Sequence, residues 1–199
     1  VIGRKVLSHR HAVPAGLQAF VQNGGRLLVM AQEPRWIEYS LGLRTAPHVA
    51  RRVYRVDAGH PVMRGLDEFD LRDWNGTSNL TEAYPRYAGF DWVPAFGWKW
   101  GNRHGVSSAP IEKPHRSGWR PILETEFDLA YSPLMELELG RGRVTLCTRD
   151  LEDHVAVDPG ANRLAKQVLE YVHTAPIAAK ARRVVYIGGD GGGQTLDTL

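Results

Sequence analysis

The first thirty residues determine the fold that the sequence predicts. Val1-Ile-Gly-Arg-Lys-Val-Leu7 has the composition of a buried strand, and Gly24-Gly-Arg-Leu-Leu-Val-Met30 leads into a second apolar strand. A helix is expected between them, from about Pro14 to Asn23. A strand, a helix and a strand in this order form a βαβ unit, which predicts a parallel sheet with right-handed crossovers. We therefore expect an α/β fold with a mostly parallel sheet and helices on both faces.

The loop after the second strand is where a ligand or a catalytic residue is expected. In open parallel sheets, ligands and nucleophiles lie in the loops that follow the carboxyl ends of the strands. Here that loop is Ala31-Gln-Glu-Pro34. It contains no Cys or Ser nucleophile and no glycine-rich phosphate loop. The sequence thus indicates a fold more clearly than a reaction.

Regular structure is expected again further along the chain. A helix near Arg35–Leu41 is ended by Gly42, and Asp158-Pro159 is a typical start for a later helix, with Asp as the N-cap. Two neighbouring strands flank Gly140-Arg-Gly142, and such a short glycine turn predicts a β-hairpin. The strands predicted after the first unit are Arg52–Val56, Ile122–Thr125, Leu134–Leu139 and Arg143–Thr148.

Composition changes divide the chain into a main domain, a linker and a tail. Residues 1–173 form the main domain, within which residues 57–120 lack periodicity and hold five of the six tryptophans, so we expect a β or irregular excursion there. Residues 174–183 read as a linker, and residues 184–199 as the start of a second, truncated α/β domain. The glycines of 188–193 do not fit the Gly-x-Gly-x-x-Gly register, so no dinucleotide cofactor is predicted.

Composition also excludes several classes of protein. The chain has 199 residues, of which 43% are hydrophobic and 24% charged, as in soluble globular domains, and no apolar run could span a membrane. The net charge is +3 and the basic residues are scattered, which argues against a nucleic-acid surface. The single cysteine, Cys147, lies in an apolar strand and is predicted to be a buried small hydrophobe. The chain opens inside a strand without an initiator Met, which suggests a fragment, and a periplasmic or secreted location is favoured over a cytoplasmic one.

Several segments follow one another in an order known from a protein family. They are Val1-Ile-Gly-Arg4, Gly24–Met30, His60-Pro-Val-Met-Arg-Gly-Leu66 with Asp70-Leu-Arg-Asp-Trp-Asn-Gly76, Tyr131-Ser-Pro-Leu-Met-Glu136, Gly140-Arg-Gly-Arg-Val144 and Asp158-Pro159. Together they resemble the glutamine-amidotransferase-like, flavodoxin-like domains attached to large bacterial glycoside hydrolases, such as the trimerisation domain of β-galactosidases. The resemblance spans most of residues 1–173 and implies a flavodoxin-like sheet.

The chain departs from active amidotransferases at both catalytic positions. The resemblance implies a nucleophilic Cys after the second strand, where this chain has Ala31 and Gln32, and a His-Pro-Glu, where His154 is followed by Val155. It therefore implies a non-catalytic accessory or assembly domain of a bacterial glycoside hydrolase. The partners expected on this basis are other domains of the same parent chain and further copies in a homo-oligomer.

Three carboxylates are the candidates for a glycosidase reaction, which is the less favoured alternative. Asp70 and Asp73 lie in an acidic and aromatic cluster with Trp74, and Glu136 lies on a predicted strand. A glycosidase needs two carboxyl groups, one as acid and one as nucleophile or base. Short acidic residues in such a cluster more often cap helices and turns.

Tryptophans supply the other alternative, a carbohydrate-binding module. Trp74, Trp92, Trp98 and Trp100 could stack on sugar rings, although aromatic residues like these more often form a core or an interface. His9 and His11 could hold a metal only with a third ligand, which the local sequence does not offer, so no metal site is predicted.

Overall fold

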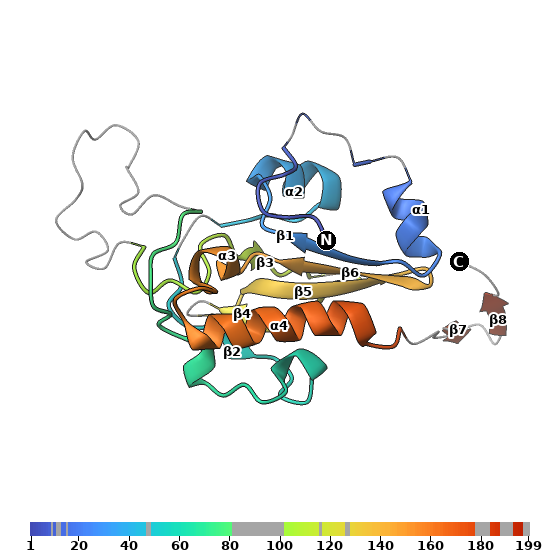
Figure 1. Ribbon diagram of the computed structural model, residues 1–199. Coiled ribbons are helices and arrows are strands. Elements are labelled where there is room, and N and C mark those ends of the chain that lie inside the picture. The colour runs from blue at the N-terminus through green and yellow to red at the C-terminus, as the bar shows by residue number, and fades with distance from the viewer. Residues whose placement is uncertain are drawn as a thin grey trace.

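Strand β1 (Arg26–Met30) forms where the sequence predicts a buried strand, and its last four residues are buried. The computed structural model describes residues 1–8, 10, 13–14, 16–46, 49–80, 102–115, 117–125, 128–177, 184–187 and 193–196. In this part of the chain, β1 belongs to a six-stranded sheet of order β1-β6-β5-β4-β2, with β3 attached to β5 (Figure 1). The other strands are β2 (Tyr54–Arg55), β3 (Ile111–Glu112), β4 (Arg120–Thr125), β5 (Tyr131–Leu139) and β6 (Gly142–Cys147).

The directions of these strands correct the sequence-based prediction. Among the ladders of this sheet that the described residues form, only β1–β6 is parallel, while β2–β4, β3–β5, β4–β5 and β5–β6 are antiparallel. The physical reason is the short connections, because β5 and β6 are joined by a tight turn in which Gly140 has φ 61°, and such a turn reverses the chain. The prediction of a mostly parallel, flavodoxin-like sheet with helices on both faces is therefore wrong. The sheet is mixed and mostly antiparallel, and of the four α-helices in the described residues only α4 is long.

The predicted first strand is also wrong. Ile2 forms a single parallel bridge with Val29 at the free edge of β1, and the chain then turns at Arg4 and Lys5. Lys5 has φ 57°, a left-handed conformation that no strand residue adopts. The predicted βαβ unit is therefore reduced to this bridge, the short helix α1 (Leu17–Gln22) and β1.

The helix boundaries that rest on capping residues are confirmed. Helix α2 (Pro34–Leu41) ends at Gly42, whose φ of 65° suits glycine. Helix α4 (Pro159–Thr174) has Asp158 as its N-cap, and the Asp158 carboxylate accepts hydrogen bonds from the amides of Gly160 and Ala161. The short helix α3 (Leu151–His154) connects β6 to α4.

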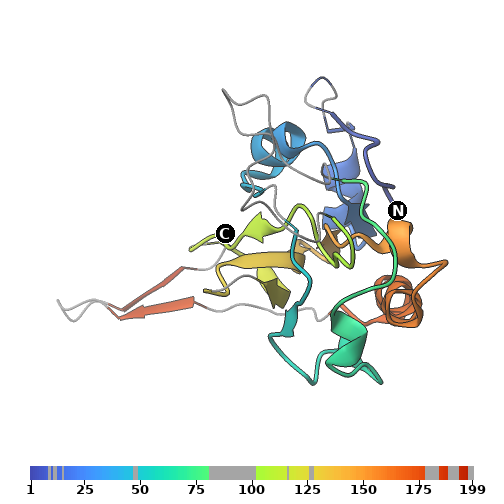
Figure 2. The ribbon, with the colours of Figure 1, turned by 90° about the vertical axis from the view of Figure 1, so that its left-hand side faces the viewer.

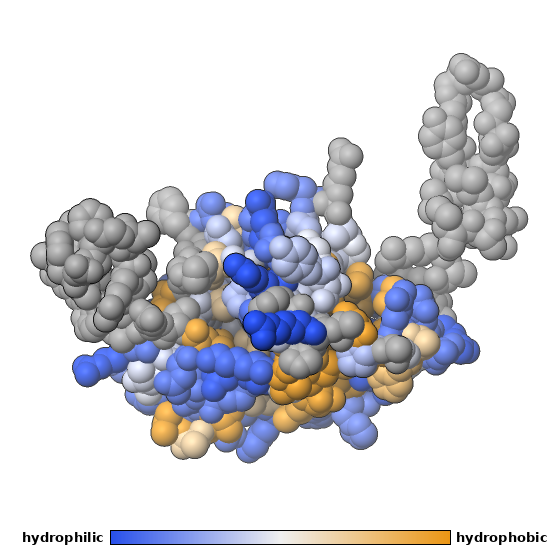
Figure 3. Space-filling view, turned by 90° about the horizontal axis from the view of Figure 1, so that it is seen from above, coloured by the Kyte–Doolittle hydropathy of each residue, from blue (hydrophilic) through white to orange (hydrophobic). Residues whose placement is uncertain are grey.

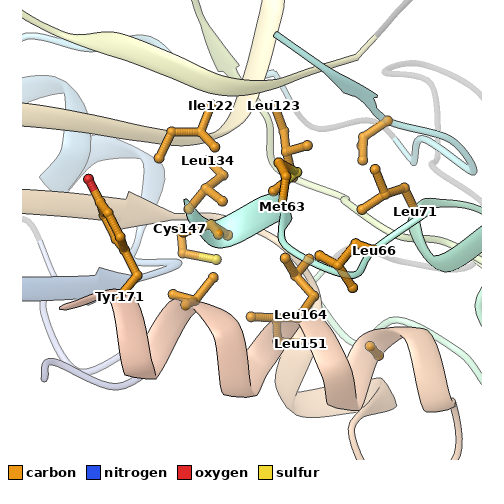
Figure 4. Close-up of a cluster of buried hydrophobic side chains, with 14 of the residues drawn as sticks. Met63, Leu66, Leu71, Ile122, Leu123, Leu134, Cys147, Leu151, Leu164 and Tyr171 are labelled. Atoms are coloured by element: carbon orange, nitrogen blue, oxygen red, sulfur yellow. The ribbon is translucent and has the colours of Figure 1, made fainter. Parts of the chain in front are cut away.

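The larger part of the core lies between the sheet and α4. Figure 4 shows Leu164 and Tyr171 of α4 on the helix side of this cluster, facing Ile122, Leu134 and Cys147 of the sheet. Cys147 has no exposed surface, so the prediction of a buried small hydrophobe is confirmed, and burial raises the pKa of its thiol to about 12.

The second part of the core is covered by the short helices. It joins Trp36 and Ile37 of α2 to Leu27, Val29 and Leu146 of the sheet. A groove of about 350 Å³ remains beside it, lined mainly by apolar side chains of α1, α2, β1, β5 and β6. Seen from above, apolar residues form separate patches bordered by hydrophilic ones (Figure 3).

The described part of the excursion contributes to the core. It includes two 3-10 helices, η1 (Pro61–Met63) and η2 (Phe69–Leu71), and buries Met63, Leu71 and Trp74 in the cluster under α4. Beyond the main sheet, β7 (Val184–Ile187) and β8 (Gly193–Leu196) pair as an antiparallel two-stranded sheet (Figure 2). None of the helices described here combines the length and the apolar character that crossing a bilayer requires.

Candidate functional site

A cavity of about 650 Å³ lies beside the carboxyl end of β1. Segments far apart in sequence form its wall. They are the N-terminal loop with Lys5, Leu7, Ser8 and Arg10, the segment Ala31–Pro34 after β1, and the single residues Thr45, Leu80, Ser108 and Ala109. This is the position at which ligands bind in sheets with parallel neighbours. Its volume and mixed lining match those of small-molecule sites.

Gln32 holds one wall of this cavity in shape. Its side-chain amide donates to the carbonyls of Gly3 (2.6 Å) and Met30 (2.8 Å), and its carbonyl accepts from the amide of Leu7 (2.7 Å). The side chain is buried, and these bonds use both of its amide protons. The Gln32 side chain thus fixes the loop of residues 3–7 against the end of β1.

The fixed loop carries Lys5 in its left-handed conformation. The Lys5 amide donates to the carbonyl of Ala31 (2.8 Å), and Arg4 forms two hydrogen bonds with Asp153, at 2.7 and 2.8 Å. The Lys5 ammonium lies 3.3 Å from the carbonyl oxygen of Asn79. A lysine with positive φ is strained, so these contacts hold a conformation that the local sequence does not favour.

A buried polar cluster lies directly behind the cavity wall. The hydroxyls of Ser78 and Ser108 both donate to Asp150 Oδ2, the latter at 2.5 Å. Burial raises the pKa of Asp150, and these hydrogen bonds only partly oppose that effect. His154 Nε2 lies 3.4 Å from Ser78 Oγ, and His154 Nδ1 lies 2.7 Å from the carbonyl oxygen of Asn75.

This cluster contains the residue types of a serine hydrolase in an arrangement that does not activate the serine. A catalytic histidine accepts the serine proton, and a carboxylate orients the histidine. Here the proton of Ser78 goes to Asp150 and not to His154 Nε2, and the group beside His154 Nδ1 is the carbonyl of Asn75 and not a carboxylate. All three side chains are fully buried, so the cluster serves to join segments around α3.

Arg149 is the other unusual buried group. Its guanidinium lies 4.0 Å above the ring of Trp74, and its three side-chain nitrogens make no hydrogen bond with any described residue. Burial lowers the pKa of Arg149 to about 9. The sequence offered no signal for this pair, because Arg149 and Trp74 are distant along the chain.

Glu136, one of the predicted catalytic candidates, lies in a dense network on β5, where its register partner Thr145 of β6 pairs in turn with Leu28 in the middle of β1. Its side chain is 1% exposed, accepts a hydrogen bond from the Tyr171 hydroxyl (2.5 Å) and pairs with Arg120. His60 Nε2 lies 3.9 Å and Arg143 Nε 3.5 Å from the carboxylate. Burial alone would raise the pKa of Glu136, but its hydrogen-bonding and positive neighbours outweigh that effect and hold the pKa at about 2.

Asp70 and Asp73 also carry arginine partners. Asp70 is buried, pairs with Arg163 of α4 and accepts a hydrogen bond from the amide of Asp67. Asp73 is half-exposed and pairs with Arg51 (2.5 Å) and Arg72 (2.8 Å). Burial would raise the pKa of Asp73, but the two arginines lower it overall.

The predicted sugar-binding tryptophans fall into two groups. Trp74 has no exposed surface, and its indole nitrogen donates to the carbonyl of Asp70 (2.8 Å). Trp92, Trp98 and Trp100 lie outside the described residues, as do His9 and His11.

The structure therefore does not unite the predicted site residues. Glu136 lies under the carboxyl-terminal part of α4, where it meets Tyr171, whereas Asp70 packs against Gly160 at the start of that helix. The cavity residues Lys5 and Ser108 were not predicted. The position of the loop after β1 was the only sequence signal that pointed toward them.

The chain is thus a mixed α/β domain with a cavity large enough for a small molecule. Comparison with known protein families finds no match for this chain, and comparison with curated proteins finds none either.

Proposed function

We propose that this chain is a non-catalytic accessory or assembly domain of a bacterial glycoside hydrolase. The assignment to a glycoside hydrolase rests on the sequence segments that resemble the accessory domains of those enzymes. The absence of catalysis is argued from the chemistry of the side chains.

One observation supports the non-catalytic role above all others, namely the state of the candidate carboxylates. A glycosidase needs one carboxyl group that stays protonated near neutral pH, which requires a raised pKa. The pKa values of Asp73 and Glu136 are shifted the other way, and Asp70 is held in an ion pair with Arg163. None of these candidates is therefore suited to act as the acid.

The position of the amidotransferase nucleophile supports the same conclusion. The sequence resemblance assigns that position to Ala31 and Gln32, and the Gln32 side chain binds three backbone groups. Cys147 is buried within the sheet, and its raised pKa keeps the thiol protonated, so it is not an alternative nucleophile.

The test is a hydrolysis screen of this chain on a panel of chromogenic glycosides, alongside the complete protein that contains it. We expect turnover only by the complete protein, and unchanged turnover when Asp70→Asn, Asp73→Asn or Glu136→Gln is introduced there at a temperature where the variant stays folded. Turnover by the isolated chain that disappears in any of these variants would overturn the proposal.

A further inference from the structure

We propose that the cavity at the carboxyl end of β1 binds a small organic carboxylate, and that Lys5 is the residue that binds its anionic group. This inference is independent of the proposed function, because an accessory domain can bind a small molecule without transforming it.

The lining of the cavity indicates an apolar ligand body. Leu7, Ala31, Pro34, Leu80 and Ala109 supply much of the wall. Small-molecule sites have volumes of roughly 300–1,000 Å³ and combine such walls with a few polar groups that fix orientation. A volume of about 650 Å³ therefore accommodates a molecule with an aromatic or branched aliphatic body.

The charges at the cavity indicate a single negative group on that ligand. Lys5 and Arg10 place two positive side chains at the wall, and Glu33 places one negative side chain there. The net charge of these three side chains is therefore plus one, which favours an anion of charge minus one. A phosphate dianion would meet Glu33 with greater repulsion. Phosphate sites ordinarily use the amides of a glycine-rich loop, and the described residues of this wall include no such loop.

The backbone at Lys5 indicates that its position is prepared in advance. Strained, non-glycine residues of positive φ persist only where the surroundings enforce them, and they cluster at ligand sites. Gln32 enforces this one through Gly3 and Leu7, and the Arg4–Asp153 pair fixes the preceding residue. A lysine held in this way loses less entropy when it binds an anion.

Ser108 also lines the cavity, but its side chain has no exposed surface. Its hydroxyl proton is donated to Asp150, so Ser108 supplies no hydrogen bond to the carboxylate of a ligand. Lys5 and Arg10 are therefore the groups that recognise the anion.

The experiment is a titration of the folded chain with benzoate, followed by backbone amide NMR shifts and calorimetry. Benzamide serves as the neutral isostere, and inorganic phosphate as the anion without an apolar body. We expect saturable shifts at Leu7, Ala31 and Ala109 with benzoate, and at least about tenfold weaker binding of benzamide, the size of effect that a hydrogen bond to a charged group produces.

The decisive variant is Lys5→Gly. Glycine adopts positive φ without strain, so this change removes the ammonium while it preserves the shape of the loop. We expect a melting temperature at least equal to that of the wild type and about tenfold weaker benzoate binding. Lys5→Arg should keep most of the affinity, and Lys166→Ala on the exposed face of α4 is the matched control that should bind benzoate as the wild type does.

Several outcomes would overturn the proposal. These are no saturable benzoate binding, equal binding of benzamide, phosphate binding as strong as that of benzoate, or wild-type affinity in Lys5→Gly. None of them bears on the hydrolysis screen, so a failure here and a failure of the proposed function can be told apart.

Discussion

The strongest prediction concerns Glu136, whose carboxylate joins three strands and a helix. We consider the substitution Glu136→Gln, which keeps the size of the side chain and removes its charge. The amide oxygen can still accept from Tyr171, but the new NH₂ group has only donors to offer to Arg120 and Arg143.

The magnitude follows from the pKa. The folded protein lowers the pKa of Glu136 from 4.5 to about 2, and each pKa unit corresponds to about 1.36 kcal/mol. The ionised form therefore gains on the order of 3 kcal/mol from folding, which agrees with the ~3–5 kcal/mol lost when one partner of a buried ion pair is removed. The partner Arg120 is more than half exposed, so we place the expected loss at the lower end, about 3 kcal/mol at pH 7.

The same shift fixes how the effect depends on pH. Because the pKa is lower in the folded state, the stabilisation is complete above pH 4.5 and is lost as the pH falls from 4.5 toward 2. The free energy of unfolding of the wild type should therefore approach that of Glu136→Gln across this interval, while the variant lacks this component of the pH dependence.

The assay is urea unfolding followed by circular dichroism at pH 7 and at several values below 4.5. Glu138→Gln is the matched control, because Glu138 lies two residues along the same strand and contacts the same Arg143 at 3.6 Å but is more exposed. It should cost no more than about 1 kcal/mol. A loss below about 1 kcal/mol for Glu136→Gln at pH 7, or a loss that stays constant down to pH 2, would refute the reasoning.

Three further substitutions test other parts of the structure. Tyr171→Phe should lower the free energy of unfolding by about 1.5–3 kcal/mol at pH 7, because it removes a donor to a charged group. Burial and Glu136 raise the pKa of Tyr171 above 10.0, so the difference in free energy of unfolding between wild type and variant should narrow as the pH rises past 10. Urea unfolding measures this difference, and a constant difference would contradict the prediction. Arg149→Met should raise the free energy of unfolding by about 1–4 kcal/mol, because it replaces a buried cation and keeps an apolar contact with Trp74; a clear loss of stability would mean that the guanidinium has a favourable role. Gly160→Ala should cost about 1–3 kcal/mol in thermal unfolding, because its Cβ would lie 2.8 Å from the carbonyl oxygen of Asp70, whereas Gly3→Ala, which meets nothing closer than 3.8 Å, should change little.

Much of the local structure could be predicted from the sequence, because its causes lie within a few residues. The buried strand β1 follows from an apolar run, the end of α2 from Gly42, and the start of α4 from Asp158 and Pro159. The β5–β6 hairpin follows from its glycine turn. Each of these features depends on a backbone dihedral angle, a helix cap or a short apolar run, all of which involve residues close together in the sequence.

The candidate site could be predicted only in its location. The sequence predicts a ligand at the loop after β1, but it predicts a strand at Lys5. Its left-handed conformation depends on hydrogen bonds that Gln32 and Ala31 make from across the loop, and those contacts exist only after β1 has formed.

The sequence by itself determined the composition of the elements, their caps and the apolar character of Cys147. Only the tertiary structure decided the direction of the strands and the partners of the charged side chains. Asp70 meets Arg163 and Glu136 meets Tyr171 across 93 and 35 residues. Such pairs depend on how the sheet and α4 pack together, and neither the period of the sequence nor the identity of neighbouring residues encodes that packing.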